Sequence, residues 1–381
     1  MANFLNIQTL KNSIRVFFLF LLVQFQALQA QNELHTITPH EIIQQVVQHY
    51  FEWYNNFSTE KDVWGNYTLD LTFEAMLFYD LLTETDAYRE KVLEIMRLRN
   101  RQSCDTIRYE SQPFCSINFA LFKATCDSAF IQPYVYESTR MLQGAKYSNE
   151  GAIYINHKMD FYLLIDYLQE YASRVARTGY LTNDTTFFVE SVKQFELYRQ
   201  ILRDPQTGLY SQGRGWLPDR MELSPGSWSR GHGWLIRGMV TSQQALPEGS
   251  LYFLQLQNYL QELADALLKV QDNSGMWHFL LHLPIEDSYP ESSGTGMIAY
   301  YLAVAYQNGF LKDEKYKVAA LNAANALRNQ VTMGGAVLNI SPGPGPLRSI
   351  DEYFQVPGET DDNHGVQAII YGMLAEIILN D

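Results

Sequence analysis

The residues with the clearest capacity for chemistry lie in the stretch SPGSWSRGHGWLIRGMV, Ser224–Val240. Trp228 and Trp234 offer flat faces against which a sugar ring can pack. Arg230 carries a planar guanidinium whose geometry matches a carboxylate. Beyond Trp234 the apolar residues fall at helical spacing, so we expect a loop running into the first turn of a helix. The alternative is that both tryptophans anchor the core and Arg230 is a surface charge, and composition does not separate the two.

Asp160 is a candidate general acid. It precedes the apolar run FYLLI at the start of an expected helix, Met159–Arg177. Partial desolvation there would raise the pKa of its carboxyl, as a general acid requires. An N-cap is the alternative, and for an isolated aspartate the residue type favours the cap.

Two further polar groups stand before expected helices. Glu291, Ser292, Ser293 and Thr295 are consistent with a simple capping cluster, and one histidine beside the acids of Asp361–His364 is a weak indication of a metal site. The sequence contains no phosphate-binding loop, dinucleotide fingerprint, HExxH or GxSxG motif.

The segments that must position these residues have mostly helical periodicity, and strand-like alternation is scarce. The expected helices are 41–54, 71–82, 88–99, 159–177, 185–202, 251–271, 296–309, 316–331 and 365–379.

A short turn containing glycine recurs between these helices, as in DPQTGLY and DNSGMW. Its glycines, Gly151, Gly208, Gly275 and Gly335, are separated by 57, 67 and 60 residues, the length of a helical hairpin. About six hairpins fit the chain, and six hairpins that close on themselves form an α/α toroid with a central pocket. An open solenoid or an irregular all-α domain is the alternative.

Composition supports one large core and excludes some partners. The chain has 381 residues, of which 46% are hydrophobic and 18% are charged, and no linker divides it. Its formal net charge of −14 makes nucleic acid and anionic membrane surfaces poor partners. A small anionic substrate remains compatible, because a pocket arginine acts at contact distance.

Residues 1–30 have the pattern of a signal peptide. Lys11 and Arg15 precede the apolar run Val16–Val23, which is too short to span a bilayer, and Ala30 offers a cleavage point. We expect an exported mature protein of residues 31–381 with a net charge of −16, after loss of those two cations. Cys104, Cys115 and Cys126 allow one disulfide and one free thiol, and their pairing is left open.

The chain resembles glycoside hydrolase family 105 and its relative family 88, the unsaturated glucuronyl or rhamnogalacturonyl hydrolases. The resemblance covers most of the mature chain and rests on ordered motifs around Met159–Leu163, Asp204–Tyr210, Ser224–Trp234, Gln271–Trp277, Glu291–Gly294 and Asp362–Gly365. It implies an (α/α)6 barrel without a metal or organic cofactor. It also implies removal of a 4,5-unsaturated uronic acid from oligosaccharides made by a lyase, through hydration of a vinyl ether.

The resemblance also suggests residue roles. It implies that Asp160 is the proton donor and that Tyr67, Arg230 and Trp234 line the sugar subsite, with Trp228 beside them. Two positions depart from the family, since Cys115 stands where a second aspartate is usual and Gln212 where a pocket histidine is usual. A thiol does not replace a carboxylate in activating water, so His232 or His364 is expected to assist. Substrates of rhamnogalacturonan, ulvan-like or glycosaminoglycan origin all remain open. The alternatives are a lyase or epimerase on the same fold, or a non-catalytic sugar-binding toroid.

Overall fold

The computed structural model describes residues 37–53, 65–99, 116–157, 160–215 and 217–380. Within these residues helices follow the apolar periodicity of the sequence. In α2 (Pro39–Trp53) the buried side chains are Ile42, Ile43, Val46, Val47 and Tyr50, which form one stripe. In α9 (Ser229–Gln243) every residue is buried. A helix buried on all sides belongs to the interior of a layered fold.

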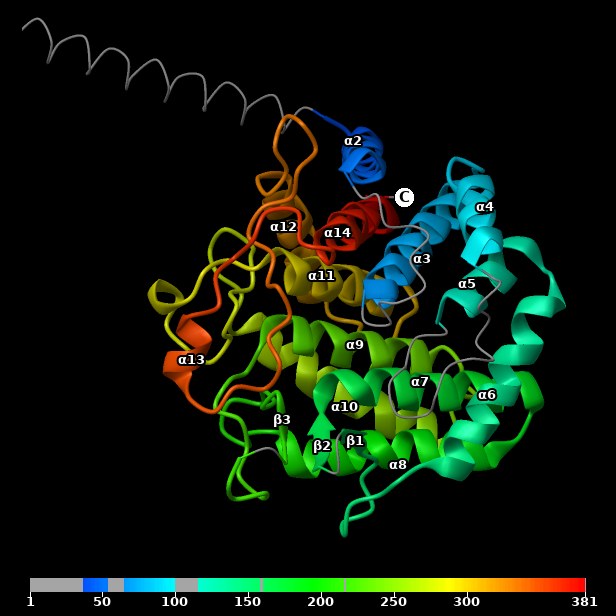
Figure 1. The fold of residues 1–381 in the computed structure, drawn as a ribbon, viewed down its shortest axis with the longest axis vertical. Coiled ribbons are helices and arrows are strands. Elements are labelled where there is room, and N and C mark those ends of the chain that lie inside the picture. The colour runs from blue at the N-terminus through cyan, green and yellow to red at the C-terminus, as the bar shows by residue number, and fades with distance from the viewer. Residues whose placement is uncertain (1–36, 54–64, 100–115, 158–159, 216, 381) are drawn as a thin grey trace, which may run out of the picture.

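Contacts between the described helices arrange them in an inner and an outer ring. Figure 1 views this barrel from the side, with α9 and α7 running across its middle. The inner helices are α3 (Gly65–Thr83), α5 (Ser116–Thr125), α7 (Ile165–Thr182), α9, α11 (Ser292–Gln307) and α14 (Gly365–Asn380). The outer helices are α2, α4 (Arg89–Arg99), α6 (Ile131–Gly144), α8 (Thr185–Leu202), α10 (Leu251–Leu268) and α12 (Glu314–Arg328). Neighbouring inner helices pack together around the ring, and Arg177 of α7 lies over the ring of Phe119 of α5. The expected (α/α)6 barrel is thereby confirmed.

Glycine turns of the expected kind connect the hairpins. The four repeat glycines have φ values of +89°, +80°, +100° and +86°, a region that other residues rarely adopt. In each turn the glycine N–H donates to a carbonyl three or four residues earlier. At Gly275 a Cβ atom would lie 2.4 Å from the carbonyl oxygen of Asn322, so glycine is required there for close approach as well.

A small sheet replaces part of one expected helix. Strands β1 (Ile155–His157), β2 (Asp160–Leu164) and β3 (Gly213–Arg214) lie in the order β1-β2-β3, all antiparallel, with His157 opposite Asp160. The prediction of a helix from Met159 is therefore wrong, because α7 begins at Ile165. The apolar run before Ile165 pairs as a strand at the mouth of the barrel.

The helix near Arg230 begins earlier than expected. Ser229 is the first residue of α9, so Arg230 and Trp234 lie within its first turns rather than in a preceding loop. The remaining described elements are the short helix α13 (Ile350–Phe354) and two 3-10 turns, η3 (Ser128–Phe130) and η4 (Ile285–Asp287). Helices α5 and α6 were not expected from the sequence.

Several sequence predictions fall outside the described residues. These are the signal peptide at 1–30 and the two cysteines Cys104 and Cys115. The third cysteine, Cys126, is described and is an exposed free thiol. Among the described residues, no helix is long and apolar enough to cross a membrane.

Candidate active site

The N-terminal ends of five inner helices bring polar side chains to one mouth of the barrel. They are Tyr67 on α3, Asp166 on α7, Arg230 on α9, Ser293 on α11 and, one residue before α14, His364. The positive end of each helix dipole faces this mouth, which favours an anionic ligand.

Arg230 is the centre of this group. Only 1% of the residue is exposed, and its Nη1 atom donates to Ser293 Oγ at 3.0 Å and to the Ser341 carbonyl at 2.5 Å. The guanidinium lies 4.5 Å from the ring centroid of Trp228. Its Nε–H has no hydrogen-bond partner among the described residues. A buried donor without a partner is costly, so this N–H is suited to an oxygen of a bound carboxylate.

Asp166, in the first turn of α7, supplies an acid. Burial raises the pKa of its carboxyl to about 6, although Arg230 and a backbone hydrogen bond act in the opposite direction. The residue remains partly exposed, so a ligand can reach it. A carboxyl with this pKa retains its proton into the mildly acidic range and can donate it.

A hydrogen-bonded chain runs from Asp362 through His364 to Tyr67. Asp362 Oδ1 lies 2.5 Å from His364 Nδ1, and His364 Nε2 contacts the Tyr67 hydroxyl. Burial and the charge of Arg230 lower the pKa of His364, while Asp362 opposes them. The imidazole is therefore neutral, with Nδ1–H donating to Asp362 and Nε2 accepting from the phenol.

The Tyr67 phenol keeps its proton. Burial raises its pKa to about 12, partly offset by the nearby charge of Arg230. The same residue is influenced by the charges of Asp166 and Asp362, which shows that these groups surround one space. Tyr67 and His364 were both expected at the site, and the structure brings them together with Arg230.

Glu291 is a structural acid. It is fully buried, and it caps α11 by accepting from the backbone N–H groups of Ser293 and Gly294. It also accepts from Ser229 Oγ at 3.0 Å and from the Ser341 N–H at 3.0 Å. The capping interpretation of this cluster is confirmed.

A strap formed by residues 341–347 crosses Arg230. Gly343 has a φ of +78°, and a Cβ atom there would lie 2.6 Å from Arg230 Nη2, so only glycine fits. Gln212 Nε2 donates to the Pro344 carbonyl at 2.9 Å, and the Tyr353 hydroxyl donates to Gln212 Oε1 at 2.5 Å. Gln212, which was expected to bind substrate, holds the strap.

The structure places Asp160 differently from the expectation. Its backbone begins β2, and its side chain lies outside the described features. Its role as proton donor stays a prediction. Asp166 was not singled out from the sequence, because the expected helix start at Met159 placed it inside the helix. An aspartate within an otherwise apolar run was the available signal.

The two remaining aromatic and imidazole candidates lie in the interior. Trp234 is 2% exposed, belongs to the main core and has Arg237 5.6 Å from its ring centroid. His232 is fully buried, with Nδ1 2.7 Å from the Trp228 carbonyl and Nε2 accepting from the Tyr210 N–H at 2.9 Å. Burial lowers the pKa of His232 to about 4, so it is neutral. Both ring nitrogens of His232 are therefore hydrogen-bonded, and the side chain joins a turn to α9. Substrate binding by His232 stays a prediction, and no ring nitrogen is free to support it.

The acids near His364 do not form a metal cluster. Asp361 pairs with His49 at 2.9 Å, whereas Asp362 pairs with His364. Over the part of the chain that the structure describes, no group of three or more His, Cys, Asp or Glu side chains is placed to hold a metal ion. Cys115 lies outside the described residues.

The protein is thus an (α/α)6 barrel that holds an arginine and a desolvated carboxyl at one mouth, groups suited to an anionic ligand. The sequence model of Glycosyl Hydrolase Family 88 matches residues 39–377, and the chain belongs to this family.

Relatives and solved structures agree with this assignment. Unsaturated rhamnogalacturonyl hydrolase YesR of Bacillus subtilis (strain 168) is 25% identical over 264 residues, which cover 68% of this chain and 73% of the relative. A family 105 glycoside hydrolase from C. acetobutylicum ATCC 824 superimposes with a TM-score of 0.74 at 20% identity, covering 87% of this chain and 98% of the other. The unsaturated glucuronyl hydrolase of Bacillus sp. GL1 gives a TM-score of 0.66 at 14% identity, covering 91% and 96%.

Proposed function

We propose that this glycoside hydrolase removes the 4,5-unsaturated uronic acid from the non-reducing end of oligosaccharides produced by a polysaccharide lyase. The observation that supports this best is the pairing of Asp166, an acid with a pKa of about 6, with the buried unpartnered N–H of Arg230. The first group supplies a proton and the second binds the carboxylate of the sugar. The names of the rhamnogalacturonyl and glucuronyl relatives point to the same substrate class.

The proposed reaction needs one acid. Asp166 gives its proton to C4 of the vinyl ether, and positive charge develops at C5 and the ring oxygen. Water then bonds to C5 and loses a proton, which the Asp166 carboxylate takes back. The C5 hemiketal opens to a ketone as its hydroxyl proton passes to the ring oxygen, which leaves a hemiacetal at C1. That hemiacetal collapses to an aldehyde, and its hydroxyl proton leaves with the remaining chain as an alcohol. Every proton is thus returned, and no metal or redox partner is required.

The state of the neighbouring acids supports hydration over ordinary glycosidic cleavage. A glycosidase that acts at the anomeric carbon uses two carboxyl groups for acid and base or nucleophile. Both oxygens of Glu291 already accept hydrogen bonds, and Asp362 is bonded to His364. Asp166 is therefore the acid of this group that is available to a ligand.

Loss of the unsaturated bond tests the proposal. We expect the protein to abolish the ultraviolet absorbance of the unsaturated uronate when it is incubated with a panel of lyase-generated oligosaccharides. Performed in deuterated water and analysed promptly by NMR, the reaction should place one deuterium stereospecifically at C4. Product that retains its double bond would show direct glycosidic cleavage. Binding without turnover across the panel would favour a non-catalytic toroid.

The activity should depend on the protonated form of Asp166. Because burial raises the pKa of its folded-state carboxyl to about 6, the proton is present below that pH and is lost above it. We expect kcat/KM to fall about tenfold per pH unit once the pH exceeds about 6. The measurement is a pH profile of kcat/KM, with circular dichroism at each pH to verify the fold. A profile that is flat or rises between about pH 6 and 8 would contradict the role of Asp166 as acid.

We further propose that the protein is exported and acts on fragments of rhamnogalacturonan or of ulvan-like glucuronorhamnan. The signal pattern of residues 1–30 supports export. The substrate range is supported by similarity to YesR and to an unsaturated 3S-rhamnoglycuronyl hydrolase of Alteromonas sp. (strain LOR), which is 26% identical over 175 residues.

A further inference from the structure

A cavity lies at the end of the barrel opposite the candidate active site. Helices α7 and α9 begin at that site and end at Thr182 and Gln243, where the cavity opens. Its volume is about 510 Å³, within the range of small-molecule sites. In Figure 1 the inner helices α7 and α9 run horizontally, with α13 beyond their left end and α6 beyond their right end. The lining includes Phe119, Lys123, Arg177, Tyr180, Gln243 and Phe310, and also the exposed carboxylate of Glu248 in the turn after α9.

The first observation concerns the charge of Arg177. This arginine is only 6% exposed, and its guanidinium lies 4.3 Å from the ring centroid of Phe119. No carboxylate among the described residues comes within 4.0 Å of it. Arg177 shares a hydrogen bond with the Tyr134 hydroxyl and is attracted by the buried carboxyl of Glu170. It still has no direct ion pair within the described structure, and a largely buried cation without one is costly. Lys123, which is exposed on the same side, adds a second positive charge. This side of the cavity is suited to an anionic group.

The second observation concerns an unused acceptor across the cavity. Gln243 is 1% exposed, and its Nε2 donates to the Phe253 carbonyl at 3.0 Å. Its Oε1 has no hydrogen-bond partner in the described structure. Gln243 is also the last residue of α9, where helix carbonyls carry partial negative charge. This side of the cavity therefore requires hydrogen-bond donors and disfavours anions.

The third observation is an exposed aromatic face between these two sides. Tyr180 is 65% exposed, and Phe119 and Phe310 also line the cavity. Flat aromatic surfaces with a few polar groups fix the orientation of a ring-shaped ligand.

We propose that this cavity is a second binding site for a uronic acid residue. The sugar carboxylate contacts Arg177 and Lys123, the ring packs on Tyr180, and a hydroxyl donates on the acceptor side, which Gln243 and the exposed carboxylate of Glu248 form. A free phosphate fits less well because it offers few donors to the acceptor side, and an aliphatic acid offers none. The expectation that acidic oligosaccharides reach the protein rests on the proposed function, whereas the cavity chemistry does not.

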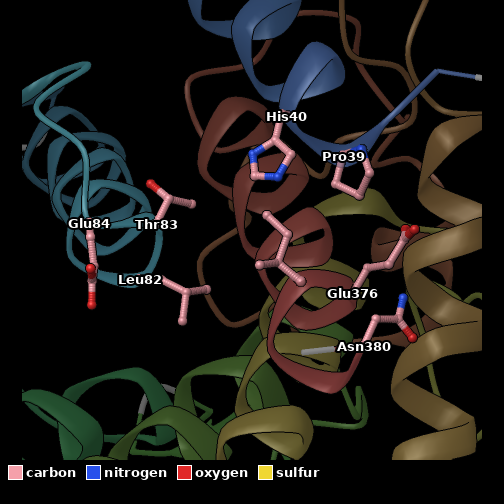
Figure 2. Close-up of a pocket in the computed structure, with 8 residues that line it drawn as sticks. Pro39, His40, Leu82, Thr83, Glu84, Glu376 and Asn380 are labelled. Carbon is pink, nitrogen blue, oxygen red and sulfur yellow. The ribbon is translucent and has the colours of Figure 1, made fainter.

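A second hollow has no comparable unused groups. It lies between α2, α3 and α14, where Figure 2 shows His40, Glu84 and Glu376 around a shallow space. His40 Nδ1 is hydrogen-bonded to the Tyr79 hydroxyl at 2.9 Å, and Glu376 forms an ion pair with Arg328 at 2.6 Å. Its main polar groups are thus already paired within the protein.

Calorimetric titration with D-glucuronate tests the second site. This saturated sugar is not a substrate, and the Arg230→Ala protein removes the carboxylate site at the other end. We expect this protein to bind D-glucuronate and not uncharged D-glucose. Adding Arg177→Gln or Tyr180→Ala should weaken the binding at least tenfold. Tyr136→Ala is the matched control, because Tyr136 is another exposed tyrosine, 59% exposed, outside the cavity.

The design separates this inference from the proposed function. If Arg177→Gln does not fold, the exposed positions Tyr180→Ala and Lys123→Gln still test the site. Arg230→Gln, which removes the positive charge, replaces Arg230→Ala if that variant does not fold. Absence of glucuronate binding to the folded Arg230 variant, or binding that Tyr180→Ala and Lys123→Gln leave unchanged, overturns the second site. Absence of hydrolytic activity of the wild-type protein on unsaturated oligosaccharides, with glucuronate binding by the Arg230 variant retained, would instead overturn the proposed function alone.

Discussion

Replacing Asp166 with asparagine will leave the fold intact and lower kcat by a factor of about 10² to 10⁴, the usual contribution of a positioned general acid. Asparagine keeps the size of the side chain but has no proton to deliver to C4. The mutant should also be at least as stable as the wild type above pH 6. Since the folded-state pKa is raised, the ionised carboxylate is disfavoured in the fold, and this cost grows as the pH rises through about 6.

Asp160→Asn is the matched comparison, because the family resemblance assigns the proton donor to Asp160. We expect this variant to retain most of its activity, since Asp160 begins β2 whereas Asp166 lies beside Arg230. Kinetics and thermal unfolding at pH 8 should be measured for both variants. Near-normal turnover of Asp166→Asn, or a larger loss in Asp160→Asn, would return the proton donor to Asp160.

Replacing Arg230 with alanine will reduce kcat/KM by a factor of about 30 to 5,000. This corresponds to about 2–5 kcal/mol, the cost of removing one partner of a desolvated charge pair. Arg230 is 1% exposed and has a free Nε–H, so little water competes for the ligand carboxylate. The defect should appear as a lower kcat/KM for the unsaturated uronate. The midpoint of thermal unfolding should change only by the amount expected from losing the Ser293 and Ser341 hydrogen bonds.

Arg230→Lys serves as the control for geometry. A lysine keeps the charge but not the planar pair of donors, so it should recover only part of the lost kcat/KM. Full recovery by lysine would mean that charge alone is recognised. Unchanged kinetics of a folded Arg230→Ala protein would remove Arg230 from substrate binding.

Much of the fold follows from the sequence. The helical periodicity of α8 is matched at both of its ends, and the four repeat glycines occupy left-handed turns as their spacing indicates. The strand β2 was mistaken for helix because a short apolar run has no periodicity that separates the two. Its pairing with β1 and β3 is a tertiary contact, which composition does not reveal.

The site could be predicted only in part, because contacts between distant segments decide which side chains meet. Arg230, Tyr67 and His364 were identified and lie together, but Asp166 was missed through the misplaced helix start. Gln212 and His232 were assigned to substrate by their position in the sequence. Their side chains bond to the strap and to a turn, contacts that the sequence does not reveal because they depend on segments far away along the chain. Substrate binding by these two residues stays a prediction.

The strap makes the Ser341 carbonyl an internal competitor for Arg230. In the free protein this neutral oxygen already accepts from Nη1, so a carboxylate that uses Nη1 as well as the free Nε–H displaces it. The apparent affinity is then the intrinsic affinity multiplied by the fraction of molecules in which the strap has yielded. Gly343 and the Gln212–Pro344 hydrogen bond hold the strap over Arg230, so we expect them to set that fraction. Sequence changes along the strap can therefore retune the working concentration range of the enzyme while every group that touches the sugar stays the same.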